Sequence, residues 1–300
     1  MPTVTETTQP LPDAVALPAA RGPGVLSRLL RNISGVVGLV LVLLFLCAGA
    51  LGGLGITPYP PNEQHVPDRM QGPSAAYVMG TDLFGRDIAS RLMKGAANSL
   101  QVALSAVALS GLIGTAIGAV AGYLGGLVDN ILMRIMDVFF AFPTILLALL
   151  VVAVLGPGLR NTILAITVVY SPIFARVARG PVLSVKEMEF VTAAHCIGLR
   201  QWRVLLRHVL PNTVAPLIVQ VSLALSWALI TEAGLSFLGL GTQPPEPSWG
   251  LMLSEGRSLA EIAPWLVAFP GLAIMVGVLG FNLLGDGLRD VLDPRLRGLR

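Results

Sequence analysis

Long runs without Asp, Glu, Lys or Arg recur along this chain and limit what it can fold into. A helix needs about 20 residues to cross the hydrocarbon core of a bilayer. Five runs exceed that length, at residues 33–56, 95–128, 138–159, 211–231 and 262–285. A sixth run, 161–175, is shorter, and the head groups of Arg176 and Arg179 can snorkel to extend it. We therefore expect an all-α, polytopic membrane protein with six spans, at about 33–56, 96–123, 132–157, 161–180, 211–235 and 262–286.

The composition excludes the main soluble classes. Of the 300 residues, 54% are apolar and 12% are charged, and the mean hydropathy is +0.76. Soluble domains carry about 25% charged residues, so these numbers argue against a soluble enzyme, a disordered chain and a disulfide-rich secreted protein. Cys47 lies in an apolar run and Cys196 in a basic segment, so we expect two free thiols. We expect no metal site, because no close Cys/His spacing occurs.

The positions of Lys and Arg predict the orientation, because cytoplasmic loops are enriched in both. With six spans both termini share one side, and that side collects all but six of the 20 Lys and Arg residues. The six on the other side are Arg69, Arg86, Arg91, Lys94, Arg160 and Arg257. We therefore expect both termini to be cytoplasmic. Residues 1–27 are expected to form a largely disordered tail, 28–290 the membrane domain and 291–300 a second tail.

The second expected span carries a stripe of small side chains at every fourth position. Its members are Ala106, Ser110, Gly114, Gly118 and Gly122. Small residues at this spacing let another helix approach closely, so we interpret the stripe as a packing surface. The alternative interpretation is that the stripe lines a pore.

The segment 184–210, between the fourth and fifth expected spans, is too polar to cross a membrane and has helical periodicity. Apolar or small residues recur at i, i+3, i+4 and i+7, first at Phe190, Ala193, Ala194 and Ile197 and then at Trp202, Leu205, Leu206 and Val209. Gly198 separates the two patterns, and Pro211 opens the next span. This arrangement predicts two short cytoplasmic helices. By itself it fits both a helix pair lying on anionic lipid and a docking element for a protein partner.

The same segment resembles the EAA loop of the permease subunits of ABC importers. That loop follows the pattern E-A-A, three residues, G, nine residues, I-x-L-P. Ala193, Ala194, Gly198, Leu210 and Pro211 match it, whereas Thr192 replaces the usual Glu and His208 the usual Ile. The resemblance implies that the first helix docks in a groove of an ATPase subunit. The residues it assigns to this coupling are Phe190, Thr192, Ala193, Ala194, Ile197, Gly198, Arg203 and Pro211.

Further motifs, in order along residues 28–297, resemble the C-type membrane subunit of dipeptide, oligopeptide and nickel permeases. They include Gly80-Thr81-Asp82 with Gly85-Arg86-Asp87, the run 121–126, the run 232–250, and 285–290 followed by Leu292-Asp293-Pro294. The dipeptide branch is the most similar. The resemblance implies a type I ABC-importer fold that moves dipeptides or short oligopeptides across the bacterial inner membrane by ATP-driven alternating access.

The resemblance also implies partners. They are a second permease subunit, two ATP-binding subunits that hold ATP and Mg²⁺, an extracytoplasmic solute-binding protein and membrane lipid, with no nucleic acid. Two alternatives stay open: the same architecture importing nickel or glutathione-like solutes, and an ATP-independent channel or secondary transporter. The second alternative does not explain the cytoplasmic helix pair.

Some polar residues outside the loop are further candidates. Glu232 lies in the otherwise apolar stretch 211–245, and a carboxylate at such a place is a candidate for the substrate path or an outer gate. The segment 82–94 is expected to be an outer amphipathic helix with an Asp87–Arg91 pair. Asp82, Arg86 and Trp249 are candidate contacts for the binding protein.

Two expectations concern local pairing and chemistry. Asp137 is one turn from Arg134, which favours a local ion pair between them. The chain has no G-x-x-x-x-G-K-[ST] phosphate loop, no G-x-S-x-G elbow and no H-E-x-x-H pair. We therefore expect it to be no enzyme by itself and to hold no cofactor of its own.

Overall fold

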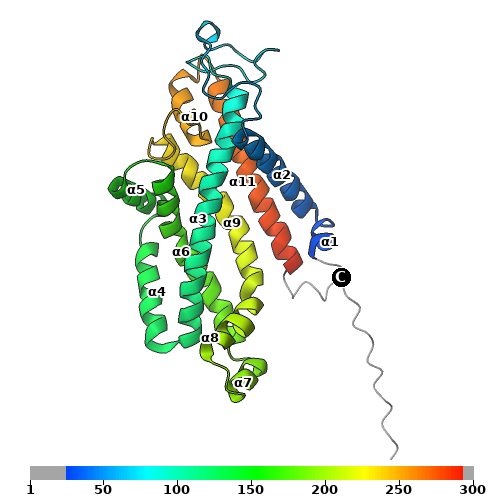
Figure 1. The fold of residues 1–300 in the computed structure, drawn as a ribbon, viewed down its shortest axis with the longest axis vertical. Coiled ribbons are helices and arrows are strands. Elements are labelled where there is room, and N and C mark those ends of the chain that lie inside the picture. Colours follow the sequence, from blue (N-terminus) through cyan, green and yellow to red (C-terminus); the bar gives the residue numbers. More distant parts are fainter. Residues whose placement is uncertain (1–24, 293–300) are drawn as a thin grey trace, which may run out of the picture.

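The computed structural model describes residues 25–292, and long helices dominate it (Figure 1). The long helices are α2 (Ile33–Gly53), α3 (Ile88–Leu124), α6 (Leu159–Val185), α9 (Val214–Phe237) and α11 (Trp265–Leu292). The shorter helices are α1 (Val25–Leu29), α4 (Gly126–Phe140), α5 (Thr144–Leu155), α7 (Glu189–Cys196), α8 (Gln201–Val204) and α10 (Trp249–Gly256). Single helical turns lie at Val66–Asp68, Leu205–Val209, Leu210–Thr213 and Arg257–Leu259. Within residues 25–292 the only β pairing is an isolated bridge between Thr81 and Asp87.

Five of the six expected spans are present as continuous helices, and the third is broken. The helices α2, α3, α6, α9 and α11 are long and apolar enough to cross a membrane. In place of a straight helix over 132–157, α4 and α5 meet at an angle of 92°. Pro143 precedes α5 with ψ of 132°, and a proline disfavours the helical conformation of the residue before it. The third expected span is therefore present as a bent pair of helices, and the chain has up to six spans if that pair counts as one.

The centre of the bundle is α3, which contacts α2, α6 and α9. A methyl group on Gly114 would collide with the carbonyl oxygen of Ser171, and one on Gly118 with that of Ala175. The helices α3 and α6 therefore meet backbone to backbone along the small-residue stripe. This confirms the interpretation of the stripe as a packing surface.

The helices α2 and α11 pack together in the same manner. Gly38 lies against the backbone of Leu283 and Leu284, and Gly280 lies against Leu41. Asn32 donates a hydrogen bond of 2.9 Å to Asp290, which brings the two ends of the described chain together. Residues 1–24 and 293–300, which include most of both expected tails, lie outside the described residues. The helix α1 begins at Val25, inside the segment expected to be a tail, and α11 continues to Leu292.

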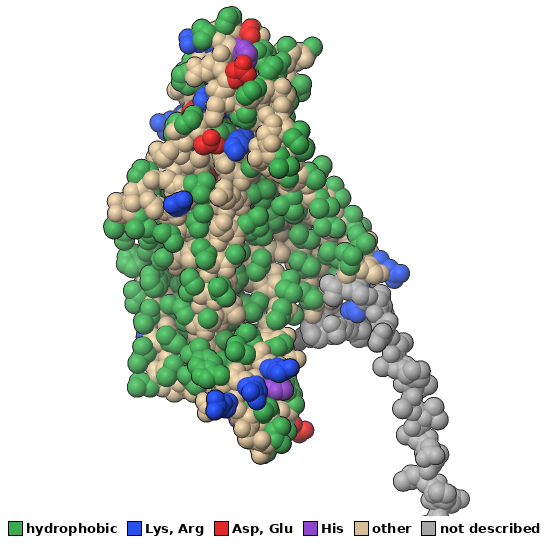
Figure 2. Space-filling view, in the orientation of Figure 1, with side chains coloured by type: hydrophobic (Ala, Val, Ile, Leu, Met, Phe, Trp, Pro, Cys, Tyr) green, Lys and Arg blue, Asp and Glu red, His purple; other side chains and the backbone are tan. Residues whose placement is uncertain are grey.

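We call the irregular segments 54–87 and 239–264 the cap, because they cover the end of the bundle remote from α7 (Figure 1). Trp265, the first residue of α11, donates its indole N–H to the carbonyl oxygen of Thr81 at 3.2 Å, which fastens the first cap segment to the start of α11. Gly85 has a φ of +76°, and a side chain there would collide with the carbonyl oxygen of His65. Figure 2 shows apolar side chains over the middle of one face of the molecule, with charged side chains mostly near its two ends.

Candidate functional site

The helix α7 ends where the sequence predicts. Gly198 has a φ of +78°, donates its N–H to the carbonyl oxygen of His195 at 2.9 Å, and is followed by a bond of 3.2 Å from the N–H of Leu199 to Ala194. These two hydrogen bonds form a Schellman motif, which a glycine favours because it adopts positive φ without steric cost. Apart from its own chain neighbours, no atom would lie within 4 Å of a Cβ placed on Gly198. The glycine is therefore required by the backbone conformation rather than by crowding.

The two faces of α7 differ from the sequence interpretation at one residue. Phe190, Ala193 and Ile197 are exposed, with Phe190 at 41% and Ile197 at 77%. Thr192 is also exposed, beside this face. Ala194 is buried together with Val191 and packs inward. The interpretation that Ala194 shares the exposed face is therefore wrong. Successive residues of a helix point about 100° apart, so Ala194 points away from the face that carries Ala193.

A small apolar cluster fastens α7 to the membrane helices. Its members come from the ends of α3 and α6, from α7 and from the turn after it: Ala119, Val182, Val185, Val191, Ala194, Val204, Leu205 and Val209. Lys186 adds a hydrogen bond of 2.9 Å from its ammonium group to the carbonyl oxygen of Gly122. The helix α7 is thus packed against the bundle through its inner face, while Phe190, Ala193 and Ile197 on its outer face are exposed.

The chain stays helical beyond α8 instead of stopping at Pro211. Leu210 donates its N–H to the carbonyl oxygen of Leu205, which closes a wide, π-helical turn. Pro211 lies in the tighter 3-10 turn Leu210–Thr213, which leads into α9. Proline has no N–H, so it changes the helical pitch here and does not end the helix. Arg203 is exposed, as are Trp202 and Leu206.

Glu232 is 1% exposed and lies inside the protein, near the cap end of α9. Its carboxylate accepts hydrogen bonds from Ser99 of α3 at 2.9 Å and from Ser236 at 2.7 Å. Buried charges need such partners. Glu232 does not line the cavity described next, and its hydrogen bond to Ser99 joins α9 to α3.

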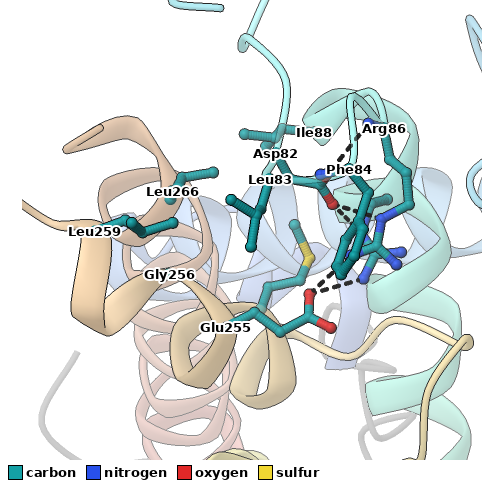
Figure 3. Close-up of a pocket in the computed structure, with 11 residues that line it drawn as sticks. Asp82, Leu83, Phe84, Arg86, Ile88, Glu255, Gly256, Leu259 and Leu266 are labelled. Carbon is teal, nitrogen blue, oxygen red and sulfur yellow. Dashed lines mark hydrogen bonds and ion pairs between the residues drawn. The ribbon is translucent and has the colours of Figure 1, made fainter. Parts of the chain in front are cut away.

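A charged cavity of about 290 Å³ lies between the cap and the bundle (Figure 3). Asp82 accepts the Nε–H of Arg86 at 2.6 Å, and the Glu255 carboxylate lies 3.2 Å from Arg86 and 3.1 Å from Arg91. Its apolar walls are Leu83, Phe84, Ile88, Met252, Leu259 and Leu266. The two positive and two negative groups balance, so the cavity is a paired network and no net-charged site.

This network joins residues that no sequence pattern brings together. The helix α3 begins at Ile88 and not at residue 82, and Asp87 caps it by accepting the N–H of Ser90 at 2.8 Å. The predicted Asp87–Arg91 pair is therefore wrong, and Arg91 binds Glu255 across 164 residues of chain. No local pattern could have found that partner, because Glu255 lies on α10.

The three candidate contacts for a binding protein are buried. Asp82 is 8% exposed, Arg86 5% and Trp249 4%. Trp249 stacks on Phe45 with ring centroids 4.5 Å apart and donates its indole N–H to Leu92 at 3.0 Å. These side chains hold the cap on the bundle, so any contact with a binding protein through them would be indirect.

Two ion pairs join α4 to α6. Arg179 binds both carboxylate oxygens of Asp129 at 2.6 Å. Arg176 binds one oxygen of Asp137 at 2.6 Å, and its guanidinium lies 3.8 Å from the centre of the Phe140 ring. The predicted local pair of Asp137 with Arg134 is therefore wrong, because the neighbouring helix supplies the partner.

Comparisons with known proteins agree with this architecture. The sequence profile described as "Binding-protein-dependent transport system inner membrane component" matches residues 114–298. A second profile, "N-terminal TM domain of oligopeptide transport permease C", matches residues 24–73.

Individual relatives match over most of their length. The chain is 46% identical to the dipeptide transport system permease protein DppC of Alkalihalophilus pseudofirmus, over 90% of this chain and 88% of that protein. It is 46% identical to the glutathione transport system permease protein GsiD of Pectobacterium atrosepticum, over 86% of each. It is 43% identical to the di/tripeptide permease DppC of Pseudomonas aeruginosa, over 88% of this chain and 89% of that protein.

Among solved structures, a chain of the MetNI methionine ABC transporter has a similar fold. The TM-score is 0.50 at 18% sequence identity, and the match covers 64% of this chain and 94% of that chain. The family profile covers more than half of the chain, and three relatives exceed 40% identity over most of their length. This chain therefore belongs to the family of inner-membrane components of binding-protein-dependent transport systems.

Proposed function

We propose that this chain is the C-type permease subunit of an ATP-driven importer for dipeptides or short oligopeptides. The observation that carries the proposal is the construction of α7. Its outer face exposes Phe190, Ala193 and Ile197, and its inner face is packed into the ends of α3 and α6. An exposed aromatic anchor beside a small residue is suited to a protein groove.

The proposed mechanism is mechanical. When ATP closes a pair of ATPase subunits, each subunit carries the α7 helix seated in it. Because Val191 and Ala194 lie in one apolar cluster with Val182 and Val204, α7 and the ends of the spans move together. The spans then change from inward-open to outward-open, and a binding protein releases its solute into the opened path. Gly198 sets the angle at which α7 leaves the bundle.

The proposal implies the partners expected from the sequence. They are a second permease, two ATP-binding subunits that hold ATP and Mg²⁺, an extracytoplasmic binding protein and lipid. The chain itself supplies no covalent chemistry. Both termini and α7 lie in the cytoplasm, in agreement with the Lys and Arg distribution.

Glutathione-like solutes are the second candidate substrate. A glutathione permease and a dipeptide permease are equally similar to this chain, at 46% identity. Both solutes carry peptide bonds and free carboxylates, so the binding protein would select between them.

Purification of the complex from native membranes tests the proposal. We expect a second permease and a Walker-type ATPase to copurify, and ATP hydrolysis to rise when peptide-loaded binding protein is added. Solute flux through the chain alone, without ATPase activity, would instead establish the channel alternative.

A further inference from the structure

The cavity between the cap and the bundle reaches the surface and has buried charges inside it (Figure 3). Leu83 and Phe84 line it and are 47% and 40% exposed, so the cavity opens beside them. Arg86 and Arg91 also line it but are only 5% and 1% exposed, so their guanidinium groups lie deep inside. A concave, mostly apolar space with a few convergent polar groups is the usual form of a small-molecule site. The cavity therefore has the construction of a ligand pocket.

The volume of the cavity limits the size of a ligand. The space is about 290 Å³. One water molecule occupies about 30 Å³ of liquid, so the cavity corresponds to about ten non-hydrogen atoms. An apolar amino acid or a dipeptide of small residues has this size, whereas a longer peptide does not fit whole.

Two polar atoms at the cavity have no partner within the protein. Glu255 contacts both Arg86 and Arg91 through a single oxygen, Oε2, at 3.2 and 3.1 Å. Among residues 25–292 no hydrogen bond reaches Oε1 of Glu255 or Nη1 of Arg86. The buried side-chain atoms without a partner in this part of the chain belong to His65 and Thr242, so Oε1 and Nη1 are open to water. The pocket thus offers an unused acceptor and an unused donor.

The fold holds this acceptor and donor in place. A Cβ on Gly256, the residue after Glu255, would lie only 2.8 Å from the Cβ of Leu266, so α10 lies directly against α11. Asp82 accepts the Nε–H of Arg86 at 2.6 Å, which fixes the guanidinium from the other side. Groups that are ordered before binding lose little conformational freedom when a ligand arrives. The pocket is therefore preorganised.

We propose that this cavity binds a small zwitterion with an apolar side chain, either a free amino acid or a dipeptide. The carboxylate of the ligand accepts the free N–H of Arg86, and its ammonium group donates to Oε1 of Glu255. Its side chain packs against Ile88, Met252 and Leu266. Because the two positive and two negative groups of the cavity balance, the site favours a ligand that also carries one charge of each sign. The site depends on residues of this chain alone and does not rest on the proposed transport function.

The first experiment measures binding directly. The purified complex in nanodiscs, with no binding protein added, is dialysed to equilibrium against tritiated L-leucine or tritiated alanyl-alanine. We expect saturable binding of at least one of them, and the one that binds more tightly identifies the source as free amino acids or peptides. No saturable binding of either compound would overturn the proposal.

Competition tests whether both charges are recognised. Leucinamide lacks the carboxylate of leucine, and 4-methylpentanoate lacks its ammonium group. We expect each to compete about tenfold more weakly or less than L-leucine, because each loses one charge-assisted hydrogen bond. Competition by either analogue at the strength of L-leucine would contradict recognition of a zwitterion.

A pair of tryptophan variants tests the location. Leu259→Trp fills the cavity and leaves its charges unaltered, whereas Ile262→Trp adds the same side chain at a position that is 72% exposed and does not line the cavity. We expect Leu259→Trp to weaken binding of the tritiated compound about tenfold or more through steric exclusion. We expect Ile262→Trp to change it less than about twofold, since the site is distant from that side chain. Equal binding by the two variants would place the site elsewhere.

Glu255→Gln separates recognition from a structural role. Glutamine keeps a carbonyl oxygen for Arg86 and Arg91 but removes the charge opposite the ammonium group of the ligand, so the cavity becomes net positive. We expect the affinity for L-leucine to fall about tenfold while the affinity for 4-methylpentanoate rises. A damaged cavity would lose affinity for both compounds alike. An unchanged preference between them would therefore overturn the role assigned to Glu255.

Discussion

The carboxylate of Glu232 accepts a hydrogen bond of 2.9 Å from Ser99, and this bond joins α9 to α3 within the protein. The second oxygen of the carboxylate accepts the hydroxyl of Ser236 at 2.7 Å. The acid that the sequence marks as a candidate for the transport path therefore connects helices below the cap.

Replacement of Glu232 tests this role. Glu232→Leu would leave two buried hydroxyl groups without their acceptor, and we expect a loss of about 1–3 kcal/mol in stability. Glu232→Gln keeps a carbonyl acceptor and is expected to lose less. The measurement is the thermal unfolding midpoint of the purified complex. A normal midpoint with lost transport in Glu232→Leu would instead indicate direct solute contact.

The contact between α3 and α6 predicts different outcomes for two glycines on the same helix. Gly118→Ala places a methyl group against the carbonyl oxygen of Ala175, so we expect a loss of about 1–3 kcal/mol from overpacking. Gly111→Ala meets Phe174 at 3.7 Å, an ordinary contact, and is expected to be neutral or to stabilise by up to about 1 kcal/mol through helix propensity. Thermal unfolding of both variants, expressed side by side, checks the difference. Equal midpoints would contradict the close approach.

The exposed face of α7 predicts where a charge uncouples transport. Ala193→Glu places a carboxylate on the face proposed to dock, and we expect binding-protein-stimulated ATPase activity to fall about tenfold or more because a buried, unpaired charge opposes docking. Gln201→Glu adds the same charge at the exposed start of α8 and serves as the control. Normal stimulation in Ala193→Glu would exclude this face as the docking surface.

Ala194 behaves differently in this scheme. It is buried against the bundle, so we expect Ala194→Glu to lower the thermal unfolding midpoint of the complex, whereas Ala193→Glu leaves the midpoint unchanged. An unchanged midpoint for both variants would show that the inner face of α7 is not packed.

We expect the stability of the cap to fall at alkaline pH because of Tyr77. Burial, together with the hydrogen bond of 2.9 Å that Tyr77 donates to Asp68, raises the pKa of Tyr77 from 10.0 to about 12. An unfolded cap loses this proton first, so the stabilisation is complete below pH 10 and is lost as the pH rises from 10 to 12. Limited proteolysis of the cap across this range measures the effect. Tyr77→Phe is expected to weaken the dependence, and a dependence of unchanged size would assign it to another group.

The sequence alone determined the parts of this protein that depend on local physics. Charge-free runs predicted the helices α2, α3, α6, α9 and α11, because an apolar segment of sufficient length must be helical in lipid. Gly198 predicted the end of α7, because positive φ favours glycine. The small residues of α3 predicted a close helix contact, because they remove the side chains that would prevent it.

The tertiary structure alone decided which groups meet. Arg91 binds Glu255, Arg176 binds Asp137, and Ala194 rather than Ala193 faces the bundle. The angle between α4 and α5 is also known only from the tertiary structure, since Pro143 indicates a break in the helix but not its angle of 92°. Local periodicity describes one helix at a time, whereas ion pairs and buried faces depend on how helices distant in sequence are placed. The sequence therefore predicts the membrane helices and their family, and only the packed structure assigns partners to the charges between them.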